Sequence, residues 1–82
     1  MVRSPHLNPA MQAVDIYVDI DGQRVRAVIP REVLENHFQA EGTPESWLQT
    51  AESRTTALTA VIRRRVRARP GDLVVVRSAD FT

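Results

Sequence analysis

Apolar and polar residues alternate strictly from residue 14 to residue 21. The apolar positions are Val14, Ile16, Val18 and Ile20. A period of two is typical of a β-strand that buries one face and leaves the other in water. The pattern therefore predicts a half-buried strand at this place in the chain.

A second strand is expected to follow directly, from Gln23 to Ile29. The dipeptide Asp21-Gly22 suits a two-residue hairpin turn, because both central positions of that turn need a positive φ. Such a turn fixes the register, and a slip of one residue would bury arginines on the inner face. The expected pairs are Ile20 with Gln23, Asp19 with Arg24, Val18 with Val25, Tyr17 with Arg26, Ile16 with Ala27 and Val14 with Ile29.

Residues 43–69 carry the period of a long amphipathic helix. Thr43 is a suitable N-cap, Pro44 fits the first helical position, and Pro70-Gly71 would end the helix. A rod of about 26 residues would be about 39 Å long. A compact chain of this size is only about 30 Å across, so the helix is expected to overhang, to break or to pack against a second copy. Its buried face is predicted to hold Trp47, Leu48, Ala51, Thr55, Leu58, Val61, Ile62 and Val66.

Two shorter elements complete the predicted fold. Pro30 ends the second strand and opens a short helix that closes at Gly42. One side of this helix is predicted to carry Val33, Leu34, His37 and Phe38. Residues 73–76 form a β-branched run that predicts a third strand. The order β-β-α-α-β indicates an α+β fold with a three-stranded antiparallel sheet in the order 2-1-3, covered on one face by a short and a long helix.

The length of 82 residues predicts one domain. Residues 1–12 contain two prolines and no periodicity, so we expect a flexible N-terminal arm before a single domain at 13–82. No apolar run approaches the roughly 20 residues of a membrane span. The N-terminus also lacks the apolar segment of a secretory signal. We therefore expect a cytoplasmic protein that does not enter membranes.

All eleven basic residues are arginines, and the formal net charge is +1. A balance so close to neutral gives no global attraction to nucleic acid, so such binding would need a local patch. The candidate contacts for an anion or a partner are Arg54, Arg63, Arg64 and Arg67. The alternative reading of the arginine-rich segment is structural, because cations stabilise the C-terminal end of a helix.

Arg54 and Arg65 project into the apolar arc of the long helix. Either a structural arginine with a covered stem or an anion-binding arginine would fit there. A carboxylate from Glu32, Glu35 or Glu41 is the expected partner.

The residues that could carry chemistry are few. His37 lies within the apolar arc of the short helix, where a packed imidazole and a catalytic group are both conceivable, but no nucleophile or metal-ligand spacing accompanies it. Residues 19–22 imitate the start of a calcium loop without its later ligands, and three glycines leave no phosphate-binding loop. We predict no catalytic, metal or cofactor site, and no enzymatic activity.

The uncovered face of the sheet is the expected association surface. It is predicted to include Tyr17, Arg24, Arg26 and Val28, together with either Val74 and Val76, which we favour, or Leu73 and Val75. The third strand is an edge without proline or lysine to block pairing. These features favour a small non-enzymatic interaction module that forms a homodimer. The alternative is an arginine-rich accessory protein that binds nucleic acid.

Three segments of the chain together resemble a known family: IPREVLENHF after the Asp-Gly turn, AESRTTAL in the long helix, and GDLVVVRSADF at the end. They are similar to the small bacterial family catalogued as domain of unknown function 1488, over about Val14 to Phe81. The resemblance implies the same succession of hairpin, short helix, long helix and final strand, and it implies no activity. The matching positions are Leu34, His37, Phe38, Arg54, Asp80 and Phe81.

Overall fold

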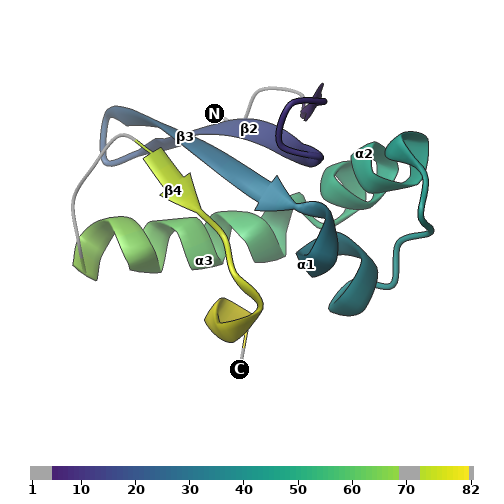
Figure 1. The fold of residues 1–82 in the computed structure, drawn as a ribbon. Helices are drawn as coiled ribbons and strands as arrows, with labels where there is room; N and C mark the ends of the chain where they lie inside the picture. The colour runs from purple at the N-terminus through teal and green to yellow at the C-terminus, as the bar shows by residue number, and fades with distance from the viewer. Residues whose placement is uncertain (1–4, 69–72, 82) are drawn as a thin grey trace.

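The computed structural model describes residues 5–68 and 73–81, with the backbone alone at residues 67 and 68. One mixed four-stranded sheet carries three helices on one of its faces (Figure 1). The predicted α+β class is confirmed. The elements are β1 (His6–Asn8), β2 (Ala13–Ile20), β3 (Gln23–Pro30), α1 (Arg31–Asn36), α2 (Pro44–Ser53), α3 (Thr55–Ala68), β4 (Leu73–Val75) and the 3-10 turn η1 (Ser78–Phe81).

The hairpin of β2 and β3 has the register that its turn predicted. Asp21 has φ 52° and Gly22 has φ 82°, which is the left-handed geometry that a tight hairpin turn requires. Ile20 pairs with Gln23, and the ladder continues in step to Val14 with Ile29. The apolar residues of both strands consequently lie on the inner face, against the helices.

The predicted order and direction of the third strand are wrong. β4 pairs with β3 in parallel, and β1 pairs with the other edge of β2, so the sheet runs β1-β2-β3-β4. Because β1 occupies the edge of β2, the edge of β3 is the one left for β4. Residues 31–68 cross the inner face between β3 and β4, which is the kind of connection that joins parallel strands. Three residues of the segment expected to be a flexible arm thus belong to the sheet.

The long helical segment breaks into α2 and α3 at Arg54. The N-cap at Thr43 is confirmed, because its hydroxyl accepts the Ser46 amide at 3.3 Å. The hydroxyl of Thr55 donates to the carbonyls of Ala51 and Glu52 at 3.1 and 2.9 Å, and such bonds compete with the helical ladder and bend it. A straight helix of about 39 Å would have exceeded the longest dimension of the molecule, 33 Å.

The short helix ends earlier than its sequence suggested. α1 stops at Asn36, and Gln39 takes the left-handed conformation, with φ 63°, that was expected of Gly42. The amide of Ala40 then donates to the carbonyl of Leu34 at 2.8 Å, which closes the end of the helix. The predicted stop of the long helix at Pro70-Gly71 lies outside the described residues.

The core lies between the inner face of the sheet and the helices. Leu58 and Ile62 of α3 are 0% exposed, as the helical pattern predicted. Trp47 and Ala51 of α2 are buried in the same cluster, so α2 and α3 cover the sheet together despite the break. No helix of the described residues lies on the opposite face of the sheet, which we call the outer face (Figure 1).

Candidate functional site

The register of β4 decides which of its residues reach the outer face. Val74 is level with Ala27, and both belong to the core. Leu73 is level with Arg26 and is 53% exposed, and Val75 is half-buried on the same side. Val74 and Val76, which the sequence analysis favoured for the outer face, are buried in the core instead. The apolar residues that β4 adds to the outer face are therefore Leu73 and Val75.

A shallow hollow opens on the outer face near the hairpin. It has a volume of about 400 Å³ and is lined by Tyr17, Arg24, Arg26 and Leu73. We call it the outer hollow. It joins an exposed leucine and an aromatic ring to two guanidinium groups, and this mixture is typical of surfaces that bind proteins.

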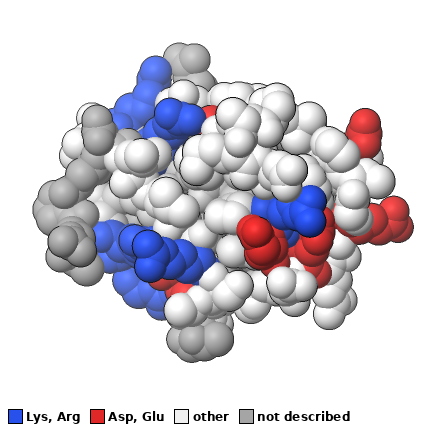
Figure 2. Space-filling model, viewed as in Figure 1, with Lys and Arg blue, Asp and Glu red and all other residues white. Residues whose placement is uncertain are grey.

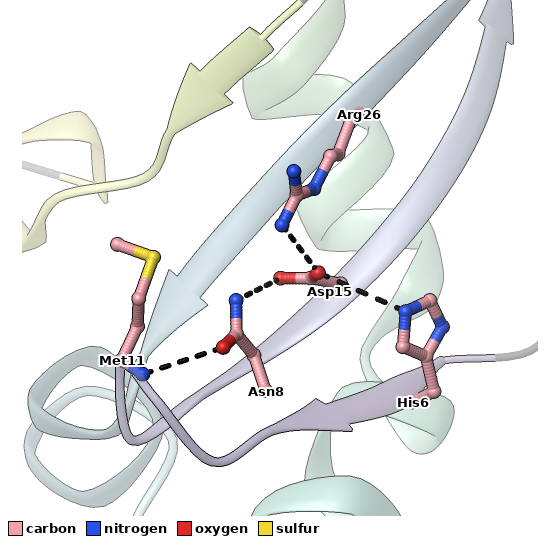
Figure 3. A network of polar contacts seen from close by, with 5 residues as sticks. All are labelled: His6, Asn8, Met11, Asp15 and Arg26. Atoms are coloured by element: carbon pink, nitrogen blue, oxygen red, sulfur yellow. Dashed lines mark hydrogen bonds and ion pairs between the residues drawn. The ribbon is translucent and has the colours of Figure 1, made fainter.

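A buried carboxylate holds one wall of the outer hollow in place (Figure 3). The side chain of Asp15 is 6% exposed and accepts a hydrogen bond from Nη2 of Arg26 at 2.8 Å. Nδ2 of Asn8 donates to the same carboxylate at 3.2 Å, and Nε2 of His6 lies 3.7 Å from it. Because the carboxylate binds groups from β1 and β3, it fixes the edge strand and the arginine together.

The outer face has a closed half and an open half. Asp15, beside β1, and Val28, opposite it on β3, are 4% and 1% exposed, so Val28 adds no accessible surface although it points outward. The ring of His6 stacks on Tyr17 at 5.8 Å and marks the border between the halves. The outer hollow and the turn of the hairpin form the open half.

The charges around the outer hollow balance. Nε of Arg24 lies 3.9 Å from Oδ1 of Asp19, and both side chains are largely exposed. Arg26 is paired with Asp15. Among the described residues, two arginines and two aspartates share this face, and their charges cancel.

The free edge of β4 is better protected than its sequence indicated. In a parallel pair, alternate residues of a strand direct their backbone groups to the neighbour. The amide of Val76 donates to Val28 at 2.9 Å, so Val75 directs its backbone groups away from β3. Nη1 of Arg65 donates to the carbonyl of Val75, and also to Oδ2 of Asp80 at 3.1 Å. The guanidinium therefore blocks part of the edge, and its carboxylate partner is Asp80 rather than Glu32, Glu35 or Glu41.

The predicted anion contacts do not form one patch. Arg54 ends α2, where its guanidinium lies 5.9 Å from the centre of the Phe38 ring. Arg63 and Arg64 lie nine and ten residues further along the chain, or about 14 Å away along α3. Nη2 of Arg64 donates to the carbonyl of Asp80 at 2.7 Å, while Arg63 is exposed. The side chain of Arg67 is outside the described part.

The visible charges are nevertheless unevenly distributed. Within its described side chains α3 carries three arginines and no acidic residue, whereas α1 and α2 together hold most of the glutamates. In the view of Figure 2, blue side chains lie mainly on the left and red ones mainly on the right, where one blue group stands among them. The C-terminal end of α3 is thus the more positive part of the surface seen there.

His37 is not sealed in the core. It is exposed at the end of α1, and its ring stacks on Phe81 at 4.4 Å and meets Phe38 edge-on at 4.7 Å. These contacts attach η1 to α1. Among the described residues, no group of three or more histidines, cysteines or carboxylates is placed to hold a metal ion.

A second, more apolar pocket of about 300 Å³ lies between β1 and the start of α2. Leu7, Pro9, Pro44 and Trp47 provide most of its walls. Nε1 of Trp47 already donates to Glu35 at 2.7 Å, so the indole has no unused donor for a ligand.

Sequence reasoning missed the Asp15 cluster. Asp15 occupies a polar position of an alternating strand, which normally faces water. It is buried because β1 covers it, and β1 has three residues without an apolar period. The available signal for this cluster was the presence of His6 and Asn8 a few residues before Asp15, but their contact with Asp15 depends on the pairing of β1 with β2.

Comparison with protein-family models, with curated proteins and with solved structures finds no match for this chain. The resemblance to domain of unknown function 1488 stays a prediction. No helix within residues 5–68 or 73–81 has the length and apolar character needed to cross a membrane.

Proposed function

We propose that this protein is a small non-enzymatic interaction module that forms a homodimer through the open half of its outer face. The supporting observation is Leu73, a large apolar side chain that is 53% exposed beside the outer hollow. Burying such a side chain on association contributes roughly 1.5–3 kcal/mol relative to leaving it in water. The surface lies on paired strands of a four-stranded sheet, so its backbone is ordered before association and little conformational entropy would be lost.

The outer face is a better association surface than the free edge of β4. Pairing of two β4 edges would have to displace the guanidinium of Arg65 from the carbonyl of Val75. Stacking of two outer faces leaves that contact intact. A face-to-face homodimer therefore breaks fewer contacts within each chain than edge-to-edge pairing of the sheets does.

The molar mass in solution tests this proposal. Sedimentation equilibrium in the micromolar range should give twice the 9.2 kDa mass of one chain. Leu73→Glu should shift the protein to the monomer, because it places a charge in the interface. The matched control is Met11→Glu, at a position that is 54% exposed outside the outer hollow, and it should leave the dimer unchanged. A wild-type chain that remains monomeric throughout this range refutes the proposal.

The second candidate function is binding of nucleic acid by the C-terminal part of α3. The supporting observation is the positive charge of Arg63 and Arg64 on a helix whose described side chains include no acid. Replacing both residues by glutamine should then weaken binding to DNA or RNA and reduce its dependence on salt. Unchanged affinity in this variant, or no binding by the wild type at low salt, excludes this function.

A further inference from the structure

The charges of the outer face stand in two neighbouring columns. β2 contributes the acidic column, the exposed Asp19 and the buried Asp15, and β3 contributes the basic column, Arg24 and Arg26. Of the two acids, Asp19 is the one that a second copy can contact. Asp19 and Arg24 are directly opposite each other in the register of the hairpin. A neutral surface with acids beside bases has no attraction for a polyanion, but it can complement a copy of itself.

The direction of a two-fold axis decides which charges meet when two outer faces stack. If the axis runs across the strands, each column lies over the same column of the second copy. Acids then approach acids and arginines approach arginines, which disfavours the complex. If the axis runs parallel to the strands between β2 and β3, the acidic column of each copy lies over the basic column of the other.

The structure thus points to one arrangement of the proposed homodimer, on which this inference rests. We propose that two outer faces stack about a two-fold axis parallel to the strands, so that Asp19 of each copy pairs with Arg24 of the other. The side chains of Asp19 and Arg24 are 42% and 55% exposed, so each can contact a second copy in addition to its partners within one chain. The C2 operation produces the pair twice, since such an interface is self-complementary.

The same arrangement explains the composition of the outer hollow. Tyr17 is level with Arg26 on the neighbouring strand, so each tyrosine ring faces a guanidinium of the other copy. Leu73 lies one strand beyond Arg26, so the same rotation places it over the β1 edge of the second copy, level with Tyr17 and near the His6 ring that stacks on it. The interface therefore buries the exposed leucine against aromatic surface.

Charge reversal tests the arrangement. Asp19→Arg alone and Arg24→Asp alone each place like charges opposite one another, and each should raise the dimer dissociation constant at least tenfold, a loss of about 1.4 kcal/mol. An equimolar mixture of the two variants should form a heterodimer with nearly wild-type affinity. The double variant should also self-associate, because its exchanged columns remain complementary. The control is Arg63→Asp on α3, which should leave the dissociation constant unchanged.

Neutralisation distinguishes the two directions of the axis. Arg24→Gln should weaken the dimer if Arg24 meets Asp19 of the second copy, and should strengthen it if arginines face arginines. Circular dichroism of each variant verifies that the hairpin is folded. If the wild type is a dimer but the two charge-reversed variants do not pair with each other, or if Arg24→Gln strengthens the dimer, the arrangement is wrong. The proposal of a homodimer is unaffected by either result. A wild-type monomer overturns both.

Discussion

Replacing Asp15 with alanine removes the carboxylate that joins β1, β2 and β3. The bond from Arg26, at 2.8 Å, is charge-assisted, and a bond of this kind contributes about 1.5–3 kcal/mol. The side chain of Arg26 is 41% exposed, so we take the lower value, about 1.5 kcal/mol. The bond from Asn8 adds about 0.5–1 kcal/mol.

The expected loss for Asp15→Ala is therefore about 2 kcal/mol in the free energy of unfolding. For a domain of this size such a loss lowers the melting temperature by roughly 8–16 °C. Part of the loss arises because Nε of Arg26 already has no hydrogen-bond partner within the described structure, so the guanidinium becomes still less satisfied. Urea unfolding followed by circular dichroism measures the free energy, and hydrogen exchange measures the release of β1.

The control is Glu52→Ala, which removes an exposed carboxylate on α2 away from the outer face. It should change the free energy of unfolding by less than about 0.5 kcal/mol. If Asp15→Ala is as stable as this control, the buried cluster does not hold the sheet together and our account of it is wrong.

Two further substitutions test the core and the edge of the sheet. Leu58→Ala should lower the free energy of unfolding by about 2–5 kcal/mol, because Leu58 is 0% exposed and its removal leaves a cavity. The control Ala57→Ser, at an exposed position, should lower it by less than about 1 kcal/mol. Equal losses in thermal unfolding would contradict the packing of α3. Arg65→Ala should lower the free energy of unfolding by about 1–2 kcal/mol and expose the edge of β4, so that aggregation measured by light scattering increases. The control Arg63→Ala should change neither the stability nor the aggregation. A soluble Arg65→Ala variant of unchanged stability would show that the guanidinium does not protect the edge.

The hairpin and the buried helical faces could be predicted because their signals are local. Asp21-Gly22 sets the turn, and the turn sets every pair from Ile20 to Val14. Leu58 and Ile62 were identified by helical period alone, and both are fully buried. The break of the helix at Arg54 was harder to locate, because the apolar residues on both sides of it follow the same helical period. The hydrogen bonds that bend the helix there come from the hydroxyl of Thr55.

The candidate site was predicted in part. Tyr17 and Arg26 were placed on the outer face correctly, since strand alternation determines the face once the register is known. Val74 and Val76 were placed wrongly, because residues 73–76 are all apolar and a run without alternating polar residues does not show which face of the strand is buried. Pairing with β3 settles the question and puts Leu73 outward.

The amino-acid sequence by itself determined the turn, the register of the hairpin, the N-cap at Thr43 and the apolar faces of the helices, since these depend on residues that are neighbours in the chain. The tertiary structure alone decided that β1 joins the sheet, that β4 runs parallel to β3, and that Asp15 is buried beneath residues of β1. The reason is that strand pairing satisfies backbone groups that are nearly alike in every residue, so the partner of an edge is selected by the space left free after the rest of the chain has packed.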